Sequence, residues 1–216
     1  MGPVTSEQRA DIAVVDYGMG NLRSASKAIE HVGAAVTLTA DPERIRSADG
    51  IVLPGVGAFP EAMRRIRSLG LERTIADAVA AGTPLLGICL GMQLLFESSA
   101  ENGGERGLGL LAGAVDALDA RGRKLPHIGW EPVSVERESP LVAGIETGEP
   151  FYFVHTFVAR PGPEHLIASA EHGERFAAIV GGERVFGTQF HPEKSSAAGL
   201  RLLGNFVEIA APVAVA

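Results

Sequence analysis

The only cysteine of the chain lies in the stretch best suited to covalent chemistry. Residues 84–95 read as a short apolar strand, a Gly-Ile-Cys-Leu-Gly turn and an apolar helical turn, with Cys89 at the centre. This order is typical of a nucleophile elbow in which cysteine replaces serine. Gly87 and Gly91 flank the thiol because only small residues pack around so tight a turn. The pattern predicts a nucleophile, whereas an isolated cysteine in an apolar run is more often a buried structural residue.

A second candidate group lies near the other end of the chain. His191, Pro192 and Glu193 follow a predicted strand over residues 185–190. Histidine suits a base that takes a proton from the thiol and later returns it to the leaving group. Glu193 would orient the ring by accepting a hydrogen bond from its other nitrogen. The alternative is a surface turn that begins a helix. Together with the elbow, the pattern favours a triad of Cys89, His191 and Glu193.

Acyl transfer also requires donors for a developing oxyanion. After an elbow, the backbone N–H of the next residue is available, and here that residue is Leu90. The glycine-rich segment 54–57 follows a predicted strand over 50–53 and contains Val56. It offers a second N–H, and its glycines would allow a peptide flip that adds or removes this donor.

The elements that position these residues indicate an α/β fold. In the first half we expect strands at 11–16, 36–38, 50–53 and 84–88, and helices at 22–31, from 41 onward, at 60–68 and at 71–81. This alternation predicts a mostly parallel central sheet flanked by helices. In the C-terminal half, shorter stretches at 114–118, 129–135, 151–158, 166–170, 176–180 and 185–190 predict additional antiparallel strands, followed by a helix at 195–210. We expect a flexible tail over residues 1–10 and a single domain over 11–216.

The composition narrows the classes of function. The chain has 216 residues, 46% of them hydrophobic, and a net charge of −7, which argues against nucleic acid as the main partner. No apolar run reaches membrane-spanning length and the first residues lack a signal-peptide pattern, so we expect no membrane partner and a cytoplasmic location. One cysteine allows neither an internal disulfide nor a cysteine-based metal cluster. Gly18 and Gly20 match half of a dinucleotide motif, but Arg23 occupies the third glycine position.

These motifs resemble a known enzyme family. Gly-Ile-Cys-Leu-Gly-Met-Gln at 87–93 and His-Pro-Glu at 191–193 are similar to the triad-type, class I glutamine amidotransferases. Segments 16–22, 53–59, 126–130, 152–155 and 187–196 more closely resemble glutaminase subunits of imidazole glycerol phosphate synthase. The resemblance spans nearly the whole chain.

The resemblance implies a reaction and a partner. Cys89 would attack the side-chain amide of glutamine, release ammonia and form a glutamyl thioester that water hydrolyses. The ammonia would pass to a TIM-barrel cyclase subunit in a heterodimer, which makes imidazole glycerol phosphate and aminoimidazole carboxamide ribotide in histidine biosynthesis. No cofactor and no metal are implied.

The resemblance also assigns residues outside the triad. By similarity, Gly57, Gln93, Thr156 and Phe157 hold glutamine, Leu90 and Val56 supply oxyanion donors, and Trp130, Tyr152 and Lys194 lie near the partner. His127 and His155 are expected to be structural. Two positions depart from the family pattern: Glu131 replaces the usual Asn after Gly-Trp, and Phe157 stands where Tyr is common. Both departures concern details of the partner contact.

Three other functions fit parts of the pattern. The first is a glutaminase of the same superfamily that feeds a different synthase, which partner exchange would reveal. The second is a stand-alone hydrolase such as a γ-glutamyl peptidase, which would be fully active without a partner. The third is a non-enzymatic binding domain, which would tolerate alkylation of Cys89.

Overall fold

The computed structural model describes residues 9–212, so residues 1–8 of the predicted tail lie outside the described residues. Its central sheet has eight strands, in the order β2 (Ala35–Thr39), β1 (Asp11–Val15), β3 (Gly50–Gly55), β4 (Leu85–Cys89), β14 (Val185–Thr188), β13 (Glu174–Gly181), β12 (Leu166–His172) and β9 (Ser134–Val135). Every pairing from β2 to β14 is parallel, and every pairing from β14 to β9 is antiparallel. The predicted α/β class and mostly parallel sheet are confirmed.

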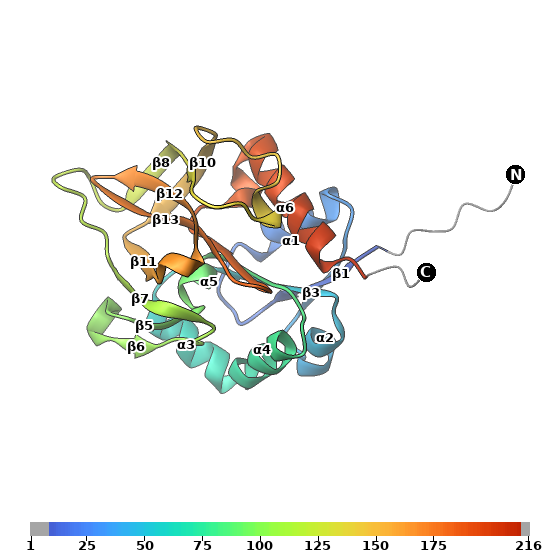
Figure 1. Ribbon diagram of the computed structural model, residues 1–216. Helices are drawn as coiled ribbons and strands as arrows, with labels where there is room; N and C mark the ends of the chain where they lie inside the picture. The colour runs from blue at the N-terminus through green and yellow to red at the C-terminus, as the bar shows by residue number, and fades with distance from the viewer. Residues whose placement is uncertain (1–8, 213–216) are drawn as a thin grey trace, which may run out of the picture.

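Helices cover both faces of this sheet (Figure 1). On one side lie α1 (Leu22–His31) and α6 (Ser196–Ala210), and on the other α2 (Pro42–Ser47), α3 (Phe59–Ser68) and α4 (Leu71–Ala80). The start of α2 follows its sequence signal, because the Asp41 side chain accepts a hydrogen bond from the Glu43 N–H at 3.0 Å and Pro42 occupies the first turn. Within residues 9–212, no helix combines the length and apolar character needed to cross a membrane.

The C-terminal half differs from the prediction, because several of its strands leave the central sheet. β8 (His127–Pro132) pairs with β10 (Pro150–His155), and β11 (Phe157–Pro161), β7 (Leu111–Ala117), β5 (Phe96–Ser99) and β6 (Glu105–Arg106) form a third sheet. The single strand predicted over 151–158 is therefore wrong: Thr156 separates β10 from β11. Short 3-10 helices occur at Glu101–Gly103, Pro140–Val142, Pro163–His165 and Pro192–Lys194. After the elbow, the helix α5 (Leu90–Gln93) is only one turn long.

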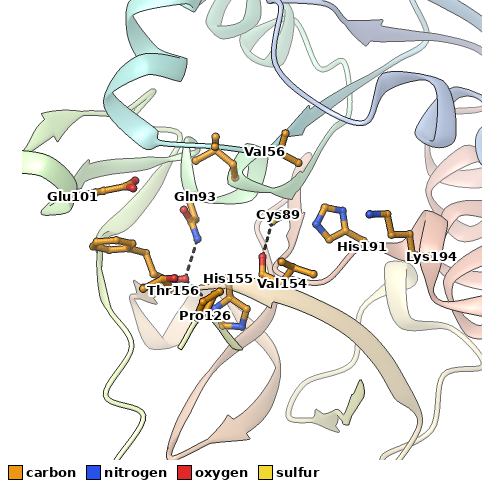
Figure 2. Close-up of a pocket in the computed structure, with 13 residues that line it drawn as sticks. Val56, Cys89, Gln93, Glu101, Pro126, Val154, His155, Thr156, His191 and Lys194 are labelled. Atoms are coloured by element: carbon orange, nitrogen blue, oxygen red, sulfur yellow. Dashed lines mark hydrogen bonds between the residues drawn. The ribbon is translucent and has the colours of Figure 1, made fainter. Parts of the chain in front are cut away.

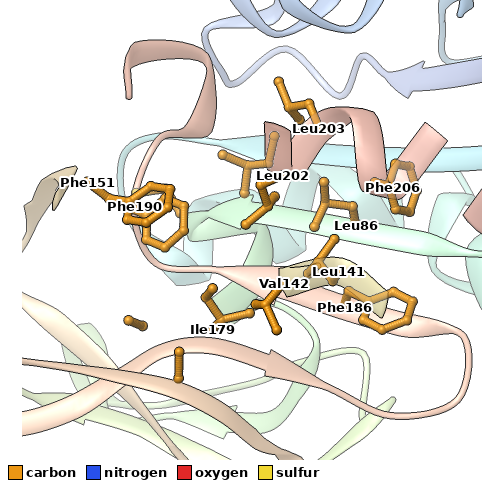
Figure 3. Close-up of a cluster of buried hydrophobic side chains, with 14 of the residues drawn as sticks. Leu86, Leu141, Val142, Phe151, Ile179, Phe186, Phe190, Leu202, Leu203 and Phe206 are labelled. Carbon is orange, nitrogen blue, oxygen red and sulfur yellow. The ribbon is translucent and has the colours of Figure 1, made fainter. Parts of the chain in front are cut away.

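One part of the core connects the β8–β10 pair to the loop that carries His191 (Figure 3). Phe151 of β10 and Phe190 are buried, and their rings stack with centroids 4.1 Å apart. The same core contains Leu202 and Phe206 from α6. Burial of such aromatic rings contributes roughly 1.5–3 kcal/mol each, so this contact holds β10 firmly against the end of β14.

Candidate active site

Cys89 occupies a strained turn between β4 and α5. Its φ of 56° and ψ of −112° lie outside the conformations usual for residues other than glycine. A Cβ added to Gly91 would lie 1.7 Å from the Leu53 carbonyl oxygen, and one on Gly87 would lie 2.6 Å from the Gly91 oxygen. Both glycines are therefore required by close backbone contacts. The strained geometry is that of the predicted nucleophile elbow.

His191 reaches the same site because its strand is the parallel neighbour of β4. In the β14–β4 register, Thr188 pairs with Ile88, so the residues after both strands lie at one edge of the sheet. His191 Nδ1 lies 2.9 Å from Glu193 Oε1. The Glu193 side chain is 1% exposed, which places the carboxylate behind the ring rather than in solvent. The structure thus brings together the three residues of the predicted triad.

The surroundings of His191 favour its charged form. Burial alone lowers the pKa of the imidazole, but hydrogen bonding and charge from Cys89 and then from Glu193 outweigh burial and raise the pKa to about 9. His191 is therefore protonated at neutral pH, with a carboxylate on one side and the sulfur of Cys89 on the other. A proton is available there for a leaving group.

A cavity of about 390 Å³ opens beside the sulfur (Figure 2). Cys89 and His191 line this cavity, and so does one predicted partner residue, Lys194. All the predicted oxyanion and glutamine residues also line it: Val56 and Leu90, and Gly57, Gln93, Thr156 and Phe157. Trp130 and Tyr152 are not part of its lining. A cavity of this size suits a small polar molecule such as an amino acid.

The Val56 loop begins directly beside the nucleophile, since Gly55 pairs with Cys89 in the β3–β4 register. The buried Tyr17 hydroxyl donates to the Pro54 carbonyl oxygen at 2.9 Å. Burial, with a smaller contribution from the charge of Cys89, raises the pKa of Tyr17 far above its usual value, so this donor stays protonated. Gly57 follows with a φ of 101°, which favours glycine. A hydrogen bond thus holds the start of the loop, and Gly57 at its tip adopts a backbone conformation that favours glycine.

Two polar side chains of the site were not found from the sequence. Gln189 is fully buried; its Nε2 lies 3.9 Å from Cys89 Sγ, and its Oε1 accepts from Gln93 Nε2 at 3.1 Å. Glu101 lines the cavity, and its carboxylate accepts from the Phe59 N–H at 2.8 Å. A polar residue at the buried end of a strand was the available signal for Gln189. Glu101 lay in a glycine-rich segment without a distinguishing pattern.

An exposed aromatic face adjoins the cavity. Trp130 and Tyr152 are cross-strand neighbours in the β8–β10 pair, with ring centroids 5.8 Å apart, and Trp130 is 48% exposed. Lys194 Nζ lies 6.0 Å from the centre of the Tyr152 ring. Val154 follows on β10, and its carbonyl oxygen lies 3.7 Å from Cys89 Sγ. The three predicted partner residues therefore lie together, and the exposure of Trp130 shows that it is not a core aromatic.

The geometry agrees with comparisons to known proteins. A family model described as glutamine amidotransferase class-I matches residues 13–210. The chain belongs to this family. The class I glutamine amidotransferases that it resembles include the imidazole glycerol phosphate synthase subunit HisH of Geobacillus kaustophilus, at 50% identity over 205 residues, covering 92% of this chain and 97% of that protein. The HisH subunit of Halobacterium salinarum is 47% identical over 215 residues, with coverages of 96% and 97%.

A solved structure described as a glutamine amidotransferase shares the fold, with a TM-score of 0.73, 21% identity, and coverage of 92% of this chain and 98% of that chain. The predicted family and enzyme class, a class I glutamine amidotransferase, are confirmed. The roles of individual residues, the cytoplasmic location and the single-domain boundaries stay predictions.

Proposed function

We propose that this chain is the glutaminase subunit of an imidazole glycerol phosphate synthase. It hydrolyses glutamine to glutamate and ammonia and passes the ammonia to a TIM-barrel cyclase subunit that makes imidazole glycerol phosphate and aminoimidazole carboxamide ribotide in histidine biosynthesis. The observation that carries this proposal is the strained Cys89 at the edge of a cavity that His191 also lines, with Glu193 Oε1 2.9 Å from His191 Nδ1. Relatives named as subunits of that synthase, at about half identity over nearly the whole chain, support the pathway.

In the proposed first half-reaction, Cys89 reacts as a thiolate beside protonated His191. The Cys89 thiolate attacks the side-chain carbonyl carbon of glutamine, and a C–S bond forms as the carbonyl oxygen becomes an oxyanion. His191 gives its proton to the amide nitrogen, the C–N bond breaks and ammonia leaves a glutamyl thioester. In the second half-reaction neutral His191 takes a proton from water, whose oxygen attacks the thioester. The C–S bond breaks, glutamate leaves, and the thiolate and protonated His191 are restored.

The oxyanion would be stabilised by the backbone N–H groups of Leu90 and Val56. Val56 belongs to the loop that begins beside Cys89 and lines the cavity, so its backbone N–H is close enough to serve as the second donor.

The hydrogen bonds of the Gln93 side chain determine which of its atoms can contact glutamine. Its Nε2 already donates to the Phe157 carbonyl at 3.0 Å and to Gln189 Oε1 at 3.1 Å, so both amide protons are used. Only the side-chain oxygen is left for glutamine, and it accepts a hydrogen bond from an N–H group of the substrate. Gly57, Thr156 and Phe157 line the same cavity and complete the contact surface.

The partner would cover the aromatic face beside the cavity. Trp130, Tyr152 and Lys194 provide rigid contact area with polar ends, which is typical of interface anchors. The face continues through Val154 to the sulfur, so ammonia released there has a short covered route into the partner. Covering matters because ammonia in bulk water is protonated and loses its nucleophilicity.

Glutamate release from glutamine tests the proposal. The purified chain would be assayed alone, with a cyclase subunit, and with that subunit and its nucleotide ligand. We expect little hydrolysis alone and a large rise in the complex. Equal rates would favour a stand-alone hydrolase, and activation by another synthase would favour a different glutaminase. Cys89→Ser should form the complex without turnover; retained turnover would exclude the cysteine mechanism.

A further inference from the structure

A cluster of buried histidines behind the cavity plays no part in the proposed reaction. His127 and Glu131 lie four residues apart on β8 and therefore face the same side of that strand. His172 ends β12, and its ring stacks on His127 with centroids 4.0 Å apart. His155 lies at the edge of the cavity, beside Pro126 (Figure 2), with its Nε2 3.0 Å from His127 Nδ1.

The hydrogen bonds fix the tautomer of each ring. His155 Nδ1 lies 3.1 Å from the Phe157 carbonyl oxygen, which can only accept, so Nδ1 carries the proton and His155 Nε2 is a bare acceptor. His127 Nδ1 must then donate to His155 Nε2, which leaves the lone pair of His127 on Nε2.

The same reasoning applies to His172. Its Nε2 lies 3.1 Å from the Lys124 carbonyl oxygen and must donate there, so in the neutral ring the lone pair of His172 is on Nδ1. Within residues 9–212, neither His127 Nε2 nor His172 Nδ1 has a hydrogen-bond partner, although both atoms are buried. The His127 side chain is only 2% exposed. A buried nitrogen without a partner is costly and calls for a group to satisfy it.

Both unpartnered nitrogens lie close to a third acceptor. Glu131 Oε1 lies 3.5 Å from His127 Nε2 and 3.8 Å from His172 Nδ1, and the three atoms lie within 4.8 Å of one another. Three acceptors with no donor among them repel one another, and a cation between them would relieve this repulsion. Two imidazole nitrogens and one carboxylate oxygen are the ligand set that zinc and its neighbours prefer.

We propose that His127, Glu131 and His172 form a binding site for a divalent transition metal of the zinc type, with a water molecule as fourth ligand. Ligand atoms on one such ion lie about 3.3 Å apart, so the two distances to Glu131 need to shorten by only a few tenths of an ångström. The His127 and His172 rings stack at an interplanar angle of 17°, so the His172 ring must turn to direct Nδ1 at the ion. His172 is at a strand end and 13% exposed, which permits this rotation.

Such an ion would act on the cavity through hydrogen bonds. With the metal on Nε2, His127 keeps its proton on Nδ1 and donates to His155, which in turn donates to the Phe157 carbonyl. That carbonyl also accepts from Gln93 Nε2. Through these hydrogen bonds, the ion would fix the position of the part of the cavity wall that contains the predicted glutamine contacts Phe157 and Gln93. The site differs from our sequence prediction of no metal.

Metal titration of the full-length chain tests the site. A Cys89→Ser background removes the thiol that would itself bind metal beside His191. After chelator treatment and its removal, Co²⁺ would be titrated at neutral pH while its visible absorption is followed, and Zn²⁺ would then be added to displace it. We expect one Co²⁺ per chain, an absorption intensity typical of four-coordination, and an affinity weakened at least about tenfold in both Glu131→Gln and His172→Gln.

Glu164→Gln is the matched control. Glu164 also lies beside a histidine, with its Oε1 3.6 Å from His165 Nε2, but outside the metal-ligand group described here. The Glu164→Gln variant should bind Co²⁺ with the same affinity as the background chain, and circular dichroism should show that all variants are folded. Absence of saturable binding would overturn the proposal and leave a proton shared by His172 and Glu131 as the explanation. Equal affinity in the background chain and Glu131→Gln would also overturn it.

Discussion

The backbone N–H of His191 donates a hydrogen bond to the backbone carbonyl of Tyr152, with 3.0 Å between nitrogen and oxygen. Ser195 reinforces this connection, because its Oγ accepts from the Tyr152 N–H at 3.0 Å and donates to the His191 carbonyl at 2.7 Å. The proposed general base is therefore held by β10, the strand that also carries the Tyr152 ring on the exposed aromatic face.

The same strand approaches the nucleophile, since the Val154 carbonyl lies 3.7 Å from Cys89 Sγ. A displacement of β10 therefore changes the positions of both groups that react. This gives a physical route by which a partner seated on the Trp130 and Tyr152 rings would alter the rate of glutamine hydrolysis. The route needs no rearrangement of the central sheet.

Glu193→Gln should separate the charge of the orienting residue from its hydrogen bond. Glutamine retains an oxygen that can accept from His191 Nδ1 but does not stabilise the protonated ring. We expect kcat for glutamine hydrolysis in the complex to fall by about 10²-fold or more, with the chain still folded. Steady-state glutamate release measures the change. Glu30→Gln, an exposed change on α1, is the control, and an unchanged kcat in Glu193→Gln would remove Glu193 from the triad.

The raised pKa of His191 predicts a pH-dependent stability. The pKa of His191 is about 9 in the folded chain against 6.5 for a histidine without these contacts, so the folded chain holds the proton more tightly. This contribution to the free energy of unfolding is fully present below pH 6.5 and is lost as the pH rises through about 9. Urea unfolding across this range should show the decline.

Cys89→Ala identifies one cause of that shift. Without the sulfur, burial still lowers the pKa of His191 and only Glu193 raises it, so the pKa should fall below 9. NMR titration of the labelled imidazole measures it, and Glu30→Gln should match the wild type. A pKa that stays near 9 in Cys89→Ala would mean that the thiol does not act on His191.

Gly91→Ala should destabilise the elbow, because its Cβ would lie 1.7 Å from the Leu53 carbonyl oxygen. Relieving that overlap requires β3 and α5 to move apart, and we expect a loss of about 3 kcal/mol or more in the free energy of unfolding. Gly204→Ala is the matched control within α6, where an added Cβ meets nothing within 4 Å. It should stabilise the chain by about 0.5–1 kcal/mol. Equal free energies in urea unfolding would contradict the packing argument.

The sequence predicted the parts of the site that rest on local patterns. The elbow shows as a local pattern because Gly87 and Gly91, which close backbone contacts require to be glycine, each lie two residues from Cys89. The pair His191 and Glu193 is local because two residues of chain bring the carboxylate to the ring. Their meeting also required β14 to pair with β4, which no local pattern reports.

The parts that were missed depend on contacts between distant segments. Alternating hydrophobicity marks 151–158 as extended, but it does not report that Thr156 lets the chain pass from the β8 pair to the β7 sheet. Gln189 reads as an ordinary strand residue until Gln93 and Cys89 are placed beside it. The convergence of His172 on Glu131 likewise joins segments 41 residues apart, beyond the reach of a motif.

Trp130→Ala should weaken the proposed complex with the cyclase subunit. Trp130 is 48% exposed and packs only against Tyr152 among the aromatic rings of the described chain, so its removal leaves the core intact. An interface anchor of this type typically costs at least about 2 kcal/mol when truncated, or roughly a thirtyfold rise in Kd. Leu69→Ala is the control, because Leu69 is 46% exposed but follows α3 on the other face of the sheet. Titration calorimetry with the cyclase subunit should show a weaker complex only for Trp130→Ala, and equal Kd values would place the partner on another surface.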